Sequence, residues 1–188
     1  MTAHHLRVLV VCTGNICRSP AVERLLTQAL GPDSGVEVTS AGVGAMVGAP
    51  MPREMAELVG AAGAATEEFA ARQLTEGLLR EADLVIGLTR SHRSRIVELY
   101  PGAVRRTFTL RELARLAAAI DPDEIPSGTP AARLAALAPI AASQRGLHAR
   151  PAGEDDVVDP WGGDKSLYRE SFDQLRPAVD VIAAVARG

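Results

Sequence analysis

The chain has 188 residues, of which 47% are hydrophobic and 23% charged. It can therefore bury the core of a single domain spanning 1–188, and it is not a disordered segment. Its formal net charge of −3 gives no basic surface of the kind that binds nucleic acid. No run of about 18 apolar residues occurs, so we expect no membrane span, and the first residues lack the pattern of a secretion signal.

The first predicted strand, 6–11, is a short apolar run rich in valine, which is typical of a buried parallel strand. It leads directly into a short loop. Ser19 and Pro20 then predict the start of a helix, with the serine as N-cap and the proline at the first helical position. Glu23 lies in the predicted first turn, where a carboxylate would complement the helix dipole. Gly31 predicts the end of this helix.

The remaining elements alternate between strands and helices, which is the pattern of an α/β domain with a parallel sheet. Predicted strands occupy residues 36–39, 83–88 and 106–109, and predicted helices occupy residues 51–63, 91–99, 110–120 and 164–187.

Residues 121–156 break this alternation with a segment rich in alanine, proline and glycine, which has one possible helix at 130–143. Two interpretations stay open at this point. The segment is either an inserted lid within the domain or a mobile surface excursion.

One short loop carries most of the chemical information, because Cys12 and Arg18 lie six positions apart between the first strand and the first helix. In such a loop, successive backbone N–H groups and the helix N-terminus surround an anion, and their field stabilises a thiolate. The Arg18 guanidinium can hold two oxygens of a phosphoryl group. Gly14 and Asn15 tolerate the left-handed backbone angles that the loop needs, and Ser19 can donate a hydrogen bond to the thiolate. The spacing therefore predicts a nucleophilic thiol in an anion-binding loop.

A cysteine and an arginine at this spacing form a weak motif by themselves. The plain alternative is a buried thiol at the end of a strand and an unrelated surface arginine. The additional Gly14, Asn15, Cys17, Ser19 and Pro20, all placed between a strand and a helix, favour the anion-binding loop strongly over that alternative.

Residues 11–20, Val-Cys-Thr-Gly-Asn-Ile-Cys-Arg-Ser-Pro, resemble the phosphate-binding loop of the low-molecular-weight protein tyrosine phosphatases. Residues 40–42 and 71–75 are similar to further segments of this family, and residues 158–162, Val-Asp-Pro-Trp-Gly, are similar to its Asp-Pro loop. The resemblance implies a doubly wound α/β fold with a central four-stranded parallel sheet flanked by helices.

The resemblance also implies roles for individual residues. Cys12 would be the nucleophile that forms a thiophosphate, and Asp159 would be the general acid. By the same resemblance, Thr13, Gly14, Asn15, Ile16, Cys17 and Arg18 bind the phosphate, Asn15, Ser19 and Ser40 support the loop, and Met46 and Trp161 line the substrate pocket. Backbone N–H groups and Arg18 can stabilise the charge of the transferring phosphoryl group, so we expect no metal and no other cofactor.

Rival general acids exist, because Asp121 also precedes a proline and Asp155 and Asp156 are close in sequence to Asp159. Asp121 lies at a predicted helix end and is more typical of a turn. We prefer Asp159 because Trp161 follows it, where the family has an aromatic side chain that stacks on the substrate.

Three departures from the family leave the substrate open. Met46 is the nearest bulky side chain where the family has a second aromatic wall, and Phe69 aligns with a histidine that supports Asn15 in many members. Ile16 stands where arginine phosphatases of the family tend to have threonine, which favours phosphotyrosine in proteins. The alternatives are phosphoarginine, a small phosphoester, or arsenate reduction, and the last is disfavoured because no cysteine follows Cys17.

A phosphate-dependent binding module without catalysis is the non-enzymatic alternative, and the presence of Cys12, Arg18 and Asp159 together argues against it. Cys17 is interpreted either as a redox partner of Cys12 or as a small packing residue. Two cysteines five positions apart cannot form a disulfide framework, so we expect a reducing, cytoplasmic setting. The four histidines show no shared ligand spacing.

Overall fold

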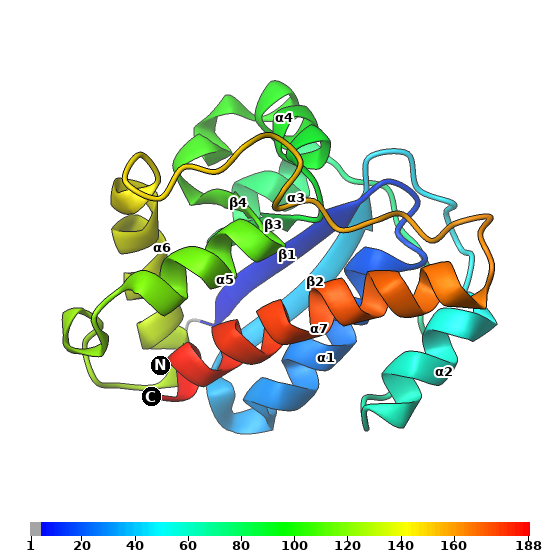
Figure 1. Ribbon diagram of the computed structural model, residues 1–188, viewed down its shortest axis with the longest axis horizontal. Coiled ribbons are helices and arrows are strands. Elements are labelled where there is room, and N and C mark those ends of the chain that lie inside the picture. The colour runs from blue at the N-terminus through cyan, green and yellow to red at the C-terminus, as the bar shows by residue number, and fades with distance from the viewer. Residues whose placement is uncertain (1–4) are drawn as a thin grey trace.

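The computed structural model describes residues 5–188, and its centre is a parallel β-sheet with helices on both faces (Figure 1). The strands are β1 (Leu6–Cys12), β2 (Val36–Gly42), β3 (Leu84–Gly87) and β4 (Thr107–Thr109). Their order in the sheet is β2-β1-β3-β4, and every neighbouring pair is parallel. The predicted doubly wound fold with a central four-stranded parallel sheet is therefore confirmed.

The helices are α1 (Arg18–Leu30), α2 (Arg53–Ala61), α3 (Glu76–Glu81), α4 (Arg90–Leu99), α5 (Leu110–Ala119), α6 (Pro130–Gln144) and α7 (Lys165–Arg187). Short 3-10 turns η1 (Pro32–Ser34), η2 (Pro101–Arg106) and η3 (Pro122–Glu124) join some of them. Each predicted helix is present, whereas α3 was not predicted. Within residues 5–188, none of these helices combines the length and the apolar composition needed to cross a membrane.

The start of α1 differs from the prediction. The helix begins at Arg18, its N-cap is Cys17, and no side chain caps it. Ser19 was predicted as the cap, but its hydroxyl turns into the preceding loop, 3.0 Å from the Cys12 sulfur. Glu23 lies beyond the first turn, and its carboxylate accepts a hydrogen bond from Ser40. Both side chains therefore serve the loop before the helix rather than the helix end.

The alternation of side chains along β1 divides the core into two parts. Val8 and Val10 face a large apolar cluster that includes buried side chains of α1, α5, α6 and α7. Leu9 and Val11 face a smaller cluster completed by α3 and α4. In Figure 1, α1, α5 and α7 cross in front of the sheet and α3 and α4 lie behind it.

Helix α6 lies inside the segment 121–156, and it packs into the large cluster beside α5 and α7. Leu134, Leu137 and Ala141 are buried there. The helix is thus part of the core and not a mobile excursion. After it, the chain continues as an irregular segment, residues 145–158, which we call the strap and which leads to Asp159. A lid function of 121–156 and the single-domain organisation stay predictions.

Candidate active site

The loop 12–18 lies at the carboxyl end of β1, the edge of a parallel sheet where ligands of such folds commonly bind. A pocket of about 160 Å³ opens above it, lined by Cys12, Thr13, Gly14, Ile16, Cys17, Arg18, Gly44, Met46, Asp159 and Trp161. The structure thus brings together residues predicted from three separate parts of the sequence.

Asn15 fixes the shape of the loop. It is fully buried and has a left-handed backbone with φ 53°, a conformation that asparagine tolerates better than most residues. Its amide nitrogen donates to Ser19 Oγ at 2.9 Å and to Ser40 Oγ at 2.8 Å. Its carbonyl oxygen accepts from the backbone N–H of Arg72 at 2.8 Å. The predicted cluster of Asn15, Ser19 and Ser40 is therefore present as a hydrogen-bonded group.

Glu23 extends this group away from the pocket, because Ser40 Oγ donates to Glu23 Oε2 at 2.5 Å. Burial raises the pKa of Glu23, while the Ser40 hydrogen bond and the nearby Arg24 and Arg72 oppose the shift. Phe69, at the position aligned with a supporting histidine, instead lies under the Arg24 guanidinium at 5.8 Å. The outer support of the loop consequently comes from Glu23 and from the Arg72 backbone.

Gly42 allows the loop to lie against the end of β2. A Cβ atom at this position would approach the Thr13 carbonyl oxygen to 2.4 Å, so the backbone contact requires glycine. Just beyond, the backbone N–H groups of Val43, Gly44 and Met46 donate to the carbonyl oxygens of residues 12, 13 and 14, each at 3.0 Å. These bonds place Met46 on one side of the pocket.

Cys12 and Arg18 form the floor of the pocket. The sulfur of Cys12 lies 3.0 Å from Ser19 Oγ, close enough for the hydroxyl to donate to a thiolate. The Arg18 side chain is 4% exposed, and its guanidinium donates to the Val157 carbonyl oxygen at 3.0 Å and to Asp159 Oδ2 at 2.6 Å. A buried guanidinium beside a buried thiol can bind an anion with more than one oxygen.

Asp159 is half exposed at the mouth of the pocket, and its second oxygen accepts from the Trp161 backbone N–H at 3.2 Å. The rival acids lie elsewhere. Asp121 caps the short turn η3 and is not among the residues that line the pocket. Asp155 pairs with Arg115 at 2.6 Å, and Asp156 accepts from the backbone N–H at the start of α4. Among the residues that line the pocket, the only carboxylate is that of Asp159.

The side walls of the pocket are apolar. Trp161 is 57% exposed and Met46 is 43% exposed, although both are large hydrophobic side chains. Ile16 adds an aliphatic side chain to the lining. An opening with one aromatic and one thioether wall can accept a flat apolar group above the charged floor.

Cys17 lies in the same loop but is 3% exposed, and its thiol donates weakly to the Tyr168 hydroxyl of α7 at 3.9 Å. Burial raises the pKa of Cys17 to about 12. The side chain is therefore a protonated thiol near neutral pH. Cys12 and Cys17 are both free.

Sequence reasoning missed His92, which is buried against the loop with Nε2 2.9 Å from Thr13 Oγ1. It also missed the contributions of Arg72 and Glu23. One signal could have identified His92: it follows β3 by five residues, and the ends of neighbouring parallel strands lie at the same edge of a sheet.

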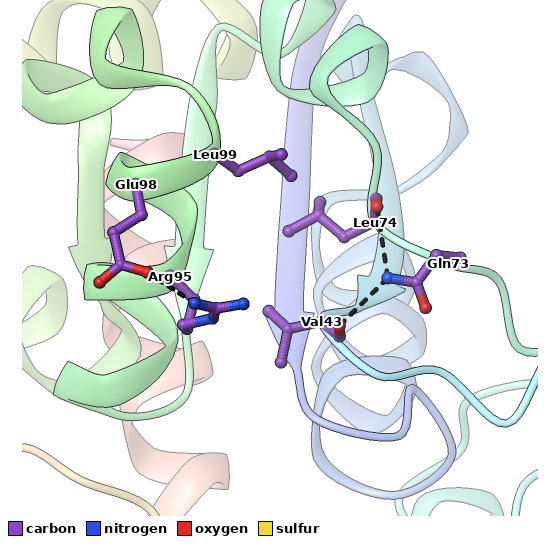
Figure 2. Close-up of a pocket in the computed structure, with 6 residues that line it drawn as sticks. All are labelled: Val43, Gln73, Leu74, Arg95, Glu98 and Leu99. Carbon is purple, nitrogen blue, oxygen red and sulfur yellow. Dashed lines mark hydrogen bonds and ion pairs between the residues drawn. The ribbon is translucent and has the colours of Figure 1, made fainter.

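A second cleft, of about 360 Å³, opens between α4 and the chain segments that follow β2 (Figure 2). Val43, Leu74 and Leu99 supply its apolar surface, and Arg95 pairs with Glu98 at its rim. It contains no thiol, and its carboxylate is already paired with an arginine. The pocket above Cys12 is therefore the better candidate active site.

The comparisons with known proteins agree with this geometry. The family model described as "Low molecular weight phosphotyrosine protein phosphatase" matches residues 7–123. A relative from Ralstonia solanacearum, the probable low molecular weight protein-tyrosine-phosphatase EpsP, is 40% identical over 106 residues, covering 56% of this chain and 71% of that protein. A protein-arginine-phosphatase from Geobacillus stearothermophilus is 31% identical over 177 residues, covering 94% of this chain and 93% of that protein.

Among solved structures, the Erwinia amylovora tyrosine phosphatase AmsI matches with a TM-score of 0.69 and 22% identity, covering 96% of this chain and 92% of that chain. This likeness supports the fold. The family model covers the loop 12–18 and most of the sheet, and the relative from Geobacillus covers nearly the whole sequence. The chain belongs to the low molecular weight phosphotyrosine protein phosphatase family and is a cysteine-based phosphatase, a phosphoric monoester hydrolase.

Proposed function

We propose that this phosphatase hydrolyses phosphotyrosine in proteins, with Cys12 as nucleophile, Arg18 as the phosphate ligand and Asp159 as general acid. The observation that carries the proposal is the convergence of these three side chains in one pocket, with Asp159 2.6 Å from the Arg18 guanidinium. A carboxylate oxygen at that distance occupies the kind of position that a phosphoryl oxygen would take.

The reaction divides into two steps. The Cys12 thiolate attacks phosphorus, and the bond to the leaving oxygen breaks as Asp159 gives that oxygen its proton. The Asp159 carboxylate then takes a proton from water, which attacks the phosphocysteine and releases phosphate and the thiolate. Arg18 and the backbone N–H groups of 13–18 bind the phosphoryl oxygens in both steps, and Ser19 stabilises the thiolate.

The pocket walls support an aromatic phosphoester. Trp161 and Met46 present apolar surface above the floor, and the side chain of Ile16 offers the substrate no hydrogen bond. A phenyl ring buries its faces against such walls, whereas a guanidinium requires acceptors for its N–H groups. Tyrosine is therefore the side chain that we favour.

Phosphoarginine is the second candidate, favoured by the relative from Geobacillus that matches almost the full chain and is named a protein-arginine-phosphatase. In this chain Asp159 could accept from a guanidinium, whereas Ile16 could not. A small phosphoester is a third possibility. We propose a reducing, cytoplasmic setting for the enzyme, which its two free cysteines support.

A substrate panel tests the proposal directly. Purified protein is assayed with phosphotyrosine, phosphoserine and phosphoarginine peptides of one sequence and with an aryl phosphate, in the presence of a metal chelator. We expect the highest kcat/KM for phosphotyrosine. A preference for phosphoarginine would make phosphoarginine the substrate in place of phosphotyrosine. Loss of all activity with chelator would contradict the metal-independent mechanism.

A further inference from the structure

His92 of α4 lies beside the phosphate-binding loop, and the reaction proposed above does not use it. Its ring is 4% exposed and lies between two hydroxyls, with Nε2 2.9 Å from Thr13 Oγ1 and Nδ1 3.0 Å from Thr89 Oγ1. Thr89 is the N-cap of α4, and its Oγ1 also accepts from the His92 backbone N–H at 3.2 Å. The imidazole therefore connects the start of α4 to the second residue of the loop.

The ring is neutral near pH 7. Burial lowers the pKa of His92 to about 4, and the positive charge of Arg18 acts in the same direction against a smaller opposing effect of Asp159. A neutral imidazole has one nitrogen that donates and one that accepts. One ring nitrogen of His92 must therefore accept a hydrogen bond from one threonine hydroxyl, while the other nitrogen donates to the second threonine hydroxyl.

The contacts of Thr89 determine which of the two nitrogens accepts. A hydroxyl donates one hydrogen bond and accepts up to two, and Thr89 Oγ1 already accepts from the His92 backbone. Within residues 5–188, the only other hydrogen-bond partner of Thr89 Oγ1 is His92 Nδ1. Its proton has an acceptor in the protein if it is donated to Nδ1, and it has none within residues 5–188 if Nδ1 carries a proton. The satisfied arrangement leaves the proton of the ring on Nε2.

An Nε2–H group donates to Thr13 Oγ1, so the Thr13 hydroxyl must direct its own proton elsewhere. Thr13 is exposed and lines the pocket beside Cys12 and Arg18. We propose that His92 is a positioning residue that orients the Thr13 hydroxyl as a hydrogen-bond donor to the substrate at the mouth of the pocket. The acceptor is an oxygen of the substrate, either on the phosphoryl group or on a carbonyl of the phosphorylated polypeptide. This inference rests on the proposed function of the pocket.

The position of the ring proton is measured first, on the free wild-type protein. A long-range ¹H–¹⁵N NMR spectrum distinguishes the two neutral tautomers and the charged ring. We expect a neutral His92 protonated on Nε2 at pH 7. A proton on Nδ1, or a charged ring, would overturn the proposal. This measurement needs no turnover, so it stands even if the proposed reaction fails.

Kinetics then test the donor. Thr13→Val removes the hydroxyl and keeps the shape, and we expect kcat/KM to fall about fivefold, the worth of one neutral hydrogen bond. Thr13→Ser keeps the hydroxyl and should lie closer to wild type. His92→Leu should lower kcat/KM by a similar factor in wild type but have little further effect in Thr13→Val, because the two residues act through one hydroxyl. Additive losses in the double variant would contradict this coupling.

Two controls complete the experiment. His92→Gln places an amide N–H near the position of Nε2 and should recover part of the activity that His92→Leu loses. His148→Leu removes a histidine outside the pocket and should leave the kinetics unchanged. An effect of Thr13→Val on an aryl phosphate and a phosphopeptide alike identifies a phosphoryl oxygen as the acceptor, and an effect on the peptide alone identifies a carbonyl. No effect on either substrate would overturn the proposal, whereas absent turnover in wild type would mean that the proposed function itself is wrong.

Discussion

At the scale of single residues, Arg18 connects the floor of the pocket to the end of the strap and to Asp159, which follows it. One guanidinium nitrogen binds the Val157 carbonyl, and another binds the Asp159 carboxylate. A lysine offers a point charge in place of this planar fork. Mutation of Cys12 and of Arg18 can therefore test the proposed nucleophile and the proposed phosphate ligand separately.

Cys12→Ser should abolish turnover, since a serine hydroxyl is not ionised at this position, whereas phosphate binding should persist because Arg18 and the loop remain. Arg18→Lys should lose both, with kcat/KM lower by at least about 100-fold from two charge-assisted hydrogen bonds. Steady-state kinetics on an aryl phosphate and calorimetric titration with phosphate measure the two properties. Activity of Cys12→Ser within tenfold of wild type would contradict the assignment.

Asp159→Asn should slow poor leaving groups much more than activated aryl phosphates, because only a poor leaving group needs a proton as its bond breaks. The high-pH limb of the kcat/KM profile should weaken in the same variant. The measurement is a series of aryl phosphates with different leaving-group acidity. Asp121→Asn is the matched control, since Asp121 caps a turn away from the pocket. The same pattern in that variant would contradict the assignment of Asp159 as the general acid.

Cys17 allows a redox prediction. Peroxide oxidises a Cys12 thiolate to a sulfenic acid, and the Cys17 thiol can condense with it, releasing water and forming a disulfide. Wild type should then show a Cys12–Cys17 peptide by mass mapping and regain most activity with dithiothreitol. Cys17→Ala should be active before peroxide treatment but should recover little activity after it. The burial of Cys17 and its protonated thiol fit the alternative that Cys17 is only a packing residue. Equal recovery of both proteins would establish that alternative.

At the scale of elements, the start of α4 is coupled to the loop through His92, and this coupling makes stability depend on pH. The unfolded chain gains a proton on this histidine near pH 6.5, whereas the folded protein does so near pH 4. The unfolded state binds more protons within this window, so the free energy of unfolding falls as the pH is lowered through it, by up to about 3 kcal/mol.

His92→Gln removes this titration while keeping a polar contact to Thr13. It should therefore lose less stability than wild type between pH 6.5 and about 4. Urea denaturation at several pH values measures the free energy of unfolding for both proteins. Parallel losses in the two proteins would show that His92 does not titrate in this window.

Elements formed from one contiguous pattern were predictable from the sequence. The valine-rich run of β1, followed by the residues of the loop, predicts the proposed nucleophile site by itself, and the alternation of strands and helices predicts the sheet. The start of α1 was predicted wrongly because Ser19 has two possible uses, and the bond to the loop outweighs a helix cap. Helix α3 was missed because it has six residues, too few to show a clear period.

At the scale of the whole molecule, the pocket and the residues around it come from segments that lie far apart in the chain, and local sequence patterns alone did not predict how they meet. Met46 comes from the loop after β2 and Asp159 from the segment before α7, and both line the pocket. His92 of α4 is not part of the lining and contacts it through Thr13. Spacing within the sequence gives no information about such contacts. The resemblance to a family supplied Met46 and Asp159. His92 was missed, and its place five residues after β3 was the one signal that indicated this edge of the sheet.

The same limit applies to 121–156, whose composition left an inserted lid and a mobile excursion open, whereas α6 packs into the core. Leu137 is fully buried there, so Leu137→Ala should lower the free energy of unfolding by about 2–5 kcal/mol. Leu147→Ala is the matched control, because this leucine lies in the same segment and is 83% exposed. Circular dichroism follows the helices, and the fluorescence of Trp161, the single tryptophan, follows the pocket.

If the chain is one domain, both signals should shift together in Leu137→Ala as one cooperative transition, with kcat unchanged under native conditions. The reason is that α6, α5 and α7 share one apolar cluster with the strand that ends at Cys12, so loosening the helix loosens the support of the pocket. An early loss of helix signal, with Trp161 fluorescence and activity retained, would instead identify 121–156 as an independently folding lid.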